Sequence, residues 1–397
     1  MKHIIVIPDG AADEPLEIFD GKTVIEAART PNIDRLCRSA YQGMVRTVPE
    51  GVAPGSDVAQ MSILGYNVLE NYNGRAPIEA AAQGIDLGSE DWVFRCNLVT
   101  YADECMADHS AGHISNEEAG KLMDVIRSEL ETENIRFYKG VSYRHLCVIS
   151  GATFDLETQP PHEIIGKPID KNLPKGKNES LIRELMLRSR SLFENHEINT
   201  VRMDLGENPV SSIWLWGQGR KTELKPFKDA YGKTGAMITA VDLARGLATL
   251  IGFDIINVEG ATGYYDTNYQ GKTEAAKEAL KTHDVVVVHI EGPDEAGHSG
   301  NAVIKKKALE RIDELVIGPL AEEMEKYQGS RMLVMPDHPT PIRTQGHTAE
   351  PVPFLIYGDG IKPNIDKTFS ERNAAQSGLF IDEGYQLMEF FLKGMRR

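Results

Sequence analysis

The chain has 397 residues, of which 41% are hydrophobic and 26% are charged, a composition typical of a soluble globular protein large enough for two domains. Its net charge of −16 disfavours nucleic acid and anionic membranes as partners, and its four scattered cysteines, with no CxxC pair, disfavour a disulfide framework or a thiolate zinc site. No apolar run approaches the ~20 residues of a membrane span, and the N-terminus turns acidic too soon for a signal peptide. We therefore expect a cytoplasmic protein with a small-molecule partner, and the sequence allows a homo-oligomer without indicating one.

The chain opens with the pattern of an α/β protein. Residues 3–8 (HIIVIP) are almost wholly apolar, which is typical of a strand buried on both faces of a parallel sheet. Thr30 and Pro31 have the residue types of an N-cap and a first helical position, which predicts a helix that extends to Ala40.

Ser56 follows a turn at Pro54 and Gly55 that ends a β-like segment at residues 43–48. We expect Gly55 to adopt a backbone conformation closed to other residues, and Ser56 to open a short helix. Free N–H groups in the first turn of a helix favour an anion such as a phosphoryl group. The same pattern also fits an N-cap serine with no further role. The rival serine, Ser62, lacks a preceding glycine turn and is more typical of a residue that packs within the helix.

The middle of the chain changes to an α+β pattern, with a surface connection rich in Pro, Lys and Gly at residues 160–177. We expect a smaller substrate or lid domain at residues 90–200, inserted into a core domain formed by residues 1–89 and 201–397. The predicted strands are 93–100 and 144–149, and the predicted helices are 116–131 and 180–194.

From residue 211 the alternation of strands and helices resumes. Such alternation predicts a mostly parallel sheet sandwiched between helices, in which residues 283–290 form the strongest strand. The other predicted strands are 211–216, 253–258, 331–335 and 352–357, and the predicted helices are 236–250, 273–281 and 302–327.

Three of the predicted strands lead into an aspartate: Asp9, Asp294 and Asp337. In open parallel sheets, sites form outside the carboxyl ends of the strands, so these side chains can converge on one crevice. A single aspartate at a strand end is usually a cap or a turn residue, but three such residues beside Pro or Gly indicate a common site.

Histidines accompany these aspartates. His298 lies four residues after Asp294, on the same face if that segment is helical, and His338 is adjacent to Asp337. His347 follows nearby, although spacing alone does not show whether it faces the same crevice. Mixed carboxylate and imidazole ligands suit Zn²⁺ or Mn²⁺, with Mg²⁺ also open, and two neighbouring ions suit phosphoryl transfer.

In order and spacing, these motifs resemble those of the alkaline phosphatase superfamily. More closely, the chain resembles the archaeal-type 2,3-bisphosphoglycerate-independent phosphoglycerate mutases over most of its length. That resemblance implies an alkaline-phosphatase-like α/β core with an inserted substrate domain. It also implies a glycolytic isomerase that interconverts 3- and 2-phosphoglycerate without 2,3-bisphosphoglycerate. The motifs are Asp9-Gly10, Gly55-Ser56-Asp57, Asp294-xxx-His298, Asp337-His338 and His347-Thr348-xx-Pro351-Val-Pro353.

The resemblance also assigns roles to these residues. It implies that Ser56 is the nucleophile and becomes phosphorylated. One divalent ion is then held by Asp294, His298 and His347, and the other by Asp9, Asp337 and His338, with Ser56 as a shared ligand. A serine hydroxyl is a poor nucleophile at neutral pH, and direct coordination to a metal ion activates it.

A doubly anionic substrate needs cations or other polar groups to bind it. Asp108 and His109 are candidates for exchanging protons with the substrate hydroxyls, which the enzyme would shield from water. The candidates for substrate binding are Arg75, Asp108, His109, His113, Arg144, His145 and Lys272.

The motifs fix the metal ligands and the nucleophile, but not the phosphoryl acceptor. A related metal-dependent phosphotransferase that acts on homoserine, a phosphatase with water as acceptor, and a non-catalytic binding protein are the alternatives. Two Gly-Lys-Thr triplets lack the first glycine of a P-loop, so neither predicts an ATP site.

Overall fold

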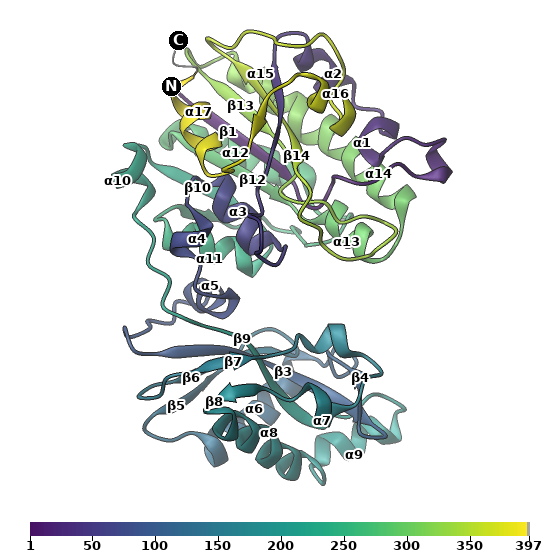
Figure 1. Cartoon of the computed structure of the whole chain (residues 1–397), viewed down its shortest axis with the longest axis vertical. Coiled ribbons are helices and arrows are strands. Elements are labelled where there is room, and N and C mark those ends of the chain that lie inside the picture. The colour runs from purple at the N-terminus through teal and green to yellow at the C-terminus, as the bar shows by residue number, and fades with distance from the viewer. Residues whose placement is uncertain (395–397) are drawn as a thin grey trace. The chain divides into compact units, whose positions relative to one another are not determined.

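The computed structural model describes residues 1–394 and divides the chain into two compact units (Figure 1). The first unit contains Met1–Tyr72 and the chain from Glu223 onward, and the second contains Asn73–Thr222. Within the described residues, no helix combines the length and the apolar composition that a membrane crossing requires.

The second unit is longer than the predicted insertion at residues 90–200. Residues 73–89 and 201–222, which the sequence assigned to the core domain, belong to it instead. The reason is strand pairing, because β9 (Ser212–Arg220) pairs antiparallel with β3 (Trp92–Ala102), and α5 (Arg75–Ala82) packs against both strands.

The first unit is built on an eight-stranded sheet in the order β11-β10-β12-β1-β13-β14-β2-β15. Every neighbouring pair is parallel except the two that β14 makes with β13 and β2, so the sheet is mostly parallel, as predicted. The strands are β1 (His3–Pro8), β2 (Tyr41–Val45), β10 (Gly235–Ile238), β11 (Asp254–Ile256), β12 (Val285–Ile290), β13 (Arg331–Val334), β14 (Val352–Gly358) and β15 (Phe380–Ile381).

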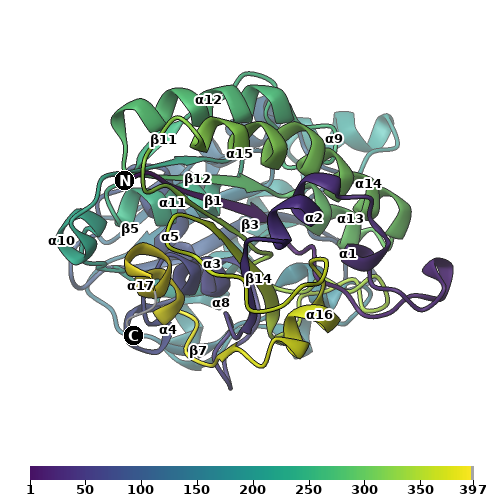
Figure 2. The same ribbon diagram turned by 90° about the horizontal axis from the view of Figure 1, so that it is seen from above.

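Helices cover both faces of this sheet, with α12 and α15 on one side of β1 and β12, and α3 and α17 on the other (Figure 2). Because β1 is covered on both faces, its residues Ile4 to Ile7 are all fully buried, which explains its continuous apolar run. The helices are α1 (Val24–Ala27), α2 (Pro31–Cys37), α3 (Ser56–Ile63), α4 (Val68–Asn71), α10 (Phe227–Tyr231), α11 (Asp242–Leu250), α12 (Tyr269–Thr282), α13 (Gly292–His298), α14 (Ala302–Ile312), α15 (Gly318–Met324), α16 (Glu371–Gln376) and α17 (Gln386–Lys393), with a 3-10 turn at Glu17–Phe19.

The long helix predicted for residues 302–327 is interrupted by a π-helical turn at Asp313–Ile317. Pro319 follows this turn and has no N–H for a regular helical hydrogen bond, which accounts for the irregularity. The turn presents the Asp313 carboxylate to the amides of Asn32 and Ile33. Asp313 therefore caps α2, whereas the predicted cap, Thr30, makes no capping hydrogen bond with its side chain.

The second unit has a five-stranded antiparallel sheet in the order β4-β3-β6-β5, with β9 also paired to β3. Helices α6 and α8 pack on this sheet around a core that includes Phe94, Leu122 and Leu185. The remaining elements are β4 (Cys105–Asp108), α6 (Asn116–Leu130), β5 (Ile135–Tyr138), β6 (Arg144–Ile149), β7 (Asp155–Glu157), a 3-10 turn (Pro161–Ile164), α7 (Ile169–Asn172), β8 (Lys175–Lys177), α8 (Glu179–Phe193) and α9 (Glu197–Asp204).

The two ends of the second unit adjoin each other. The Asn73 side chain donates a hydrogen bond to the carbonyl of Lys221 at 3.3 Å. The chain thus enters and leaves this unit through two neighbouring segments.

Candidate metal centre

The three predicted aspartates meet at the carboxyl ends of neighbouring strands. In the sheet, β1 lies between β12 and β13, and Asp9, Asp294 and Asp337 follow these three strands in the chain. All three side chains are buried. This is the edge at which open α/β sheets place their sites.

Asp294, His298 and His347 form one group of potential metal ligands. The Nε2 atom of His298 lies 3.2 Å from Asp294 Oδ2, and the Nε2 atom of His347 lies 3.5 Å from Asp294 Oδ1. The two Nε2 atoms are 2.9 Å apart, so they converge on one point. Although burial disfavours its charged form, the hydrogen bond to Asp294 raises the pKa of His298 to about 9.

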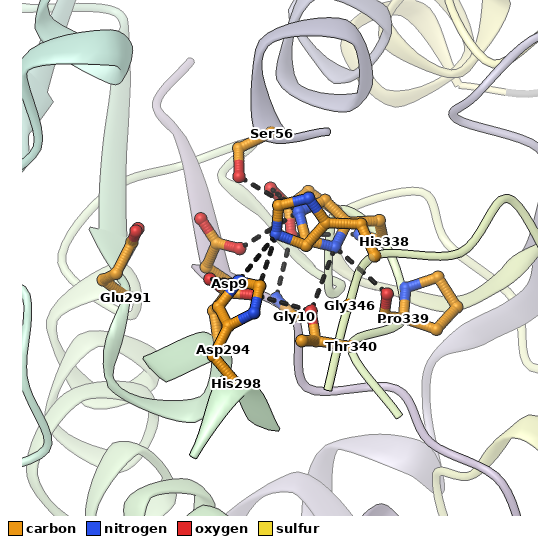
Figure 3. A network of polar contacts seen from close by, with 12 residues as sticks. Asp9, Gly10, Ser56, Glu291, Asp294, His298, His338, Pro339, Thr340 and Gly346 are labelled. Atoms are coloured by element: carbon orange, nitrogen blue, oxygen red, sulfur yellow. Dashed lines mark hydrogen bonds and ion pairs between the residues drawn. The ribbon is translucent and has the colours of Figure 1, made fainter. Parts of the chain in front are cut away.

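Ser56, His338 and Asp9 lie together beside this group (Figure 3), and Asp337 contacts His338. The Nε2 atom of His338 is 3.0 Å from Ser56 Oγ, 3.4 Å from Asp9 Oδ1 and 3.6 Å from Asp337 Oδ2. Asp9, Asp294 and His338 also offer ligand atoms close enough to hold one ion, so the two groups are contiguous.

The donor set fits divalent cations. Burial, together with the charges of Asp337 and Asp294, raises the pKa of Asp9 well above its usual value. Asp9 Oδ1 is buried and accepts no hydrogen bond from the described residues. Crowded, buried carboxylates are costly unless a positive charge neutralises them, and imidazole nitrogens that converge with carboxylate oxygens suit Mn²⁺ or Zn²⁺.

Ser56 is the first residue of α3, as predicted, and its side chain is almost buried. The prediction for Gly55 was wrong in its reason, because Gly55 has an extended backbone with φ of 178°. A Cβ atom at Gly55 would lie 2.6 Å from Asp57 Oδ1, so a side chain there would require the Asp57 carboxylate to shift. The turn thus brings Ser56 to the carboxyl edge of the sheet without left-handed backbone.

Related proteins match this chain along nearly its whole length. Residues 38–199 match the model of a family described as 2,3-bisphosphoglycerate-independent phosphoglycerate mutase. Across 99% of this chain and 100% of the relative, the sequence is 46% identical to a Geobacter sulfurreducens protein named a probable 2,3-bisphosphoglycerate-independent phosphoglycerate mutase. A Methanosarcina mazei protein, named a 2,3-bisphosphoglycerate-independent phosphoglycerate mutase, shows the same identity and the same coverage. The chain belongs to this family.

Solved structures agree with this membership. A Pyrococcus horikoshii protein matches with a TM-score of 0.82 and 28% identity, over 100% of this chain and 98% of its own. The cofactor-independent phosphoglycerate mutase of Thermoplasma acidophilum matches with a TM-score of 0.66 and 26% identity, over 99% of each chain. The family resemblance predicted from the sequence is confirmed.

In the second unit of this family member, three arginines gather around one glutamate. Glu79 accepts from Arg95 Nε at 2.9 Å and from Arg75 Nε at 3.1 Å. The guanidinium of Arg95 lies 4.2 Å from the centre of the Trp216 ring. Burial lowers the pKa of Arg95 to about 10, and the charges of Arg75 and Arg144 act in the same direction. Arginines this close to one another raise the local positive potential, which favours an anionic ligand.

Predicted substrate residues surround Tyr143 beside these arginines. Arg144 Nη2 donates to the Tyr143 hydroxyl at 3.0 Å. The rings of His109 and His113 meet the Tyr143 ring edge-on, with centroid distances of 5.6 and 6.1 Å. Burial lowers the pKa of His109, and the charges of Arg144 and Arg95 contribute. The structure therefore brings His109, His113 and Arg144 together.

Three other predicted substrate residues have interior partners instead. The Asp108 carboxylate accepts from the amides of Ser110 and Gly112, which, with two further donors, holds its pKa at about 2 despite burial. His145 is buried, accepts from the Gly140 amide through Nδ1, and has its pKa lowered by burial to about 3. These positions favour structural roles, in a loop and in a strand.

Lys272 lies in the first unit, on α12, and so does not join the arginine cluster. Its Nζ atom is buried and donates to the carbonyl of His289 at 2.9 Å. Burial lowers the pKa of Lys272 to about 8.

Several polar residues of these clusters were not predicted. Gln60 and His289 contact Asp9, and the Thr340 hydroxyl donates to Asp294. Gln60 lies four residues after Ser56 and therefore on the same helical face, which is a signal the sequence does carry. His289 is the single polar residue in the apolar strand VVVVHI. Arg95 is likewise a charged residue within a buried strand.

Proposed function

We propose that Ser56 carries the phosphoryl group while this enzyme interconverts 3-phosphoglycerate and 2-phosphoglycerate. Membership of the family makes the chain a phosphoglycerate mutase, an isomerase that moves a phosphoryl group within one molecule. The single observation that supports the role of Ser56 is its position. Its Oγ lies 3.0 Å from His338 Nε2, at the edge of a buried cluster of aspartates and histidines.

We assign the candidate ligands to two divalent ions. Asp294, His298 and His347 would hold one ion, and Asp9, Asp337 and His338 the other, with Ser56 as a shared ligand. When bound, the ions would neutralise the carboxylates and the phosphoryl oxygens and would favour the deprotonated form of the serine hydroxyl. Mn²⁺, Zn²⁺ and Mg²⁺ are the candidates, and the names of the relatives exclude 2,3-bisphosphoglycerate as a required cofactor.

The reaction consumes no water. Ser56 Oγ forms a bond to the phosphorus of 3-phosphoglycerate, the bond from phosphorus to the substrate's 3-oxygen breaks, and the serine proton passes to that oxygen. In the second step, the 2-hydroxyl of the retained glycerate takes the phosphoryl group, and its proton returns to Ser56. Within the second unit, His109 is the candidate for proton exchange with a substrate hydroxyl, because burial lowers its pKa and favours the neutral imidazole, whereas the Asp108 carboxylate accepts from the amides of Ser110 and Gly112.

The arginine cluster of the second unit would bind the carboxylate of the substrate. Glu79 accepts from Arg75 and Arg95, whereas the guanidinium of Arg144 donates to the neutral hydroxyl of Tyr143, so the charge of Arg144 suits an anion. This assignment makes residues 73–222 the substrate domain.

The alternatives differ in the acceptor of the phosphoryl group. A phosphatase would pass it to water, and a homoserine phosphotransferase would pass it to another alcohol. The relatives are named as mutases, which does not favour either alternative.

The test uses the full chain loaded with Mn²⁺ and supplied with 3-phosphoglycerate. We expect 2-phosphoglycerate to form without net release of inorganic phosphate, and Ser56→Ala to lower kcat by at least about 10⁴-fold, because it removes the nucleophile. Ser62→Ala is the matched control, since Ser62 lies on the same helix and donates only to the carbonyl of Thr47. Turnover by Ser56→Ala close to that of Ser62→Ala would exclude the phosphoserine route.

A further inference from the structure

The buried side-chain amide of Gln60 contacts both Asp9 and Asp337. Gln60 is only 1% exposed, and its Nε2 atom lies 3.2 Å from Asp9 Oδ2 and 3.1 Å from Asp337 Oδ2. An amide nitrogen carries two hydrogens, which matches these two oxygens. The opposite orientation would set the amide oxygen against two carboxylates, so the observed one is favoured.

His289 holds the same oxygen of Asp9. Its Nε2 atom lies 2.6 Å from Asp9 Oδ2, and its Nδ1 atom lies 3.0 Å from Thr239 Oγ1. An ionised Asp9 carboxylate can only accept, so the contact of 2.6 Å places the hydrogen of the imidazole on Nε2. Nδ1 is then the acceptor for the Thr239 hydroxyl, which itself accepts from the amide of Val241.

This network fills a space that otherwise resembles a third metal site. Asp9, His289 and Asp337 have ligand atoms within 4.8 Å of one another. The Gln60 Nε2 atom, however, lies 3.0 Å from His289 Nε2 and close to both carboxylate oxygens, so the amide nitrogen occupies the position of an ion. The amide supplies positive hydrogens there without a cation.

We propose that Gln60 and His289 are positioning residues that orient Asp9 and Asp337 for the divalent ion shared with His338. They engage Asp9 through Oδ2 and leave Oδ1 on the side of His338 and Ser56, where it has no hydrogen-bond partner among the described residues. Mutation of a residue that hydrogen-bonds a metal ligand commonly lowers metal affinity about 10–100-fold. The inference rests on the proposed function, because it concerns the same ions.

The experiment measures Mn²⁺ binding to the metal-free full chain by calorimetric titration, with the Mn²⁺ electron paramagnetic resonance spectrum as a second readout. Gln60→Met keeps the length of the side chain and removes both donors. We expect it to weaken binding of one of the two ions about 10–100-fold, and to lower kcat at limiting Mn²⁺ without changing KM for phosphoglycerate. His289→Gln should act in the same direction. The double variant should lose less than the product of the two separate factors, since both residues orient Asp9.

Two further variants keep the test decisive. Thr239→Val removes only the hydroxyl that fixes the His289 hydrogen, so it should give a smaller loss of affinity even if the other variants fail to fold. Ser62→Ala is the control. It removes a buried hydrogen bond from the same helix, but that bond goes to the backbone carbonyl of Thr47, so the affinity for both ions should stay unchanged.

The outcomes separate the two proposals. A wild-type chain that binds two ions, with Gln60→Met and Thr239→Val unchanged in affinity and spectrum, would overturn the positioning role alone. Three ions per wild-type chain would overturn the claim that the amide fills the third space. A wild-type chain that turns over phosphoglycerate but binds no Mn²⁺ or other divalent ion would overturn the proposed metal chemistry together with this inference.

Discussion

The two units of this enzyme carry polar clusters of opposite charge. In the first unit, aspartates crowd at the ends of parallel strands, and burial together with their like charges raises the pKa of Asp9. In the second unit, arginines crowd on one glutamate, and their like charges help to lower the pKa of Arg95. Each cluster is incomplete in charge by itself. The aspartate cluster suits cations, and the arginine cluster suits an anion.

The clusters also differ in how the fold assembles them. The aspartates follow strand ends, where the backbone bends and side chains from neighbouring strands meet. The arginines come from the start of α5 and from within β3 and β6, so their meeting depends on strand register. Variants in the two clusters should therefore affect different steps, and the predictions below are arranged to separate them.

The largest effect is expected in the first cluster. Asp294 offers ligand atoms to two of the three potential metal groups, so Asp294→Asn should weaken both ions and lower kcat by about 10³-fold or more. Metal content by elemental analysis and turnover at saturating substrate check this. Glu322→Gln on α15 is the control, because Glu322 is exposed and belongs to none of the ligand groups found among the described residues. Full metal content in Asp294→Asn would contradict the ligand assignment.

A variant of the second cluster should affect binding rather than chemistry. Arg144→Met removes a guanidinium beside Tyr143 and should raise KM for phosphoglycerate about 10–100-fold, because a charge-assisted hydrogen bond contributes roughly 1.5–3 kcal/mol. The metal content should stay at the wild-type value. Arg136→Met on the neighbouring strand is the control, since Arg136 is exposed and bonds only to the carbonyl of Thr132. A loss of bound metal in Arg144→Met would contradict the prediction that this cluster affects substrate binding alone.

The smallest effect concerns stability in the second unit. His145 is buried and neutral, with its pKa lowered from 6.5 to about 3 by burial. The unfolded chain binds a proton below pH 6.5 and the folded chain does not, so His145 makes the free energy of unfolding fall as the pH decreases, by about 1.4 kcal/mol per pH unit.

His145→Asn should remove that dependence, because the asparagine oxygen can still accept from the amide of Gly140. Urea unfolding of the variant and the wild type between pH 7.5 and 5 checks this. Their difference in unfolding free energy should shift in favour of the variant as the pH falls. A constant difference would show that His145 takes up a proton in the folded state.

Much of the first cluster was predictable from the sequence, because its residues stand at fixed places relative to apolar strands. A strand end is visible in one sequence, and so is the four-residue spacing of Asp294 and His298, which the structure shows on α13. Gln60 and His289 were missed because a polar residue inside a helix or strand carries no local mark of what it faces across the core.

The second unit was harder to predict, because its limits depend on long-range pairing. Strand β9 has the apolar pattern of the strands that follow it, yet it pairs with β3 more than 100 residues earlier. Similarly, the sequence shows Arg95 only as a charged residue within an apolar strand. Its contacts with Glu79 and Trp216 are visible in the structure alone. Composition does not reveal such partners.

The adjoining ends of the second unit have a consequence for how this architecture can change. Because Asn73 and Lys221 are joined by a hydrogen bond, the chain enters and leaves the second unit at neighbouring positions. Exchange of this unit for one of another size would leave the strand order of the eight-stranded sheet unchanged. An exchange could thus replace the second unit while the sheet that carries the aspartate cluster is retained.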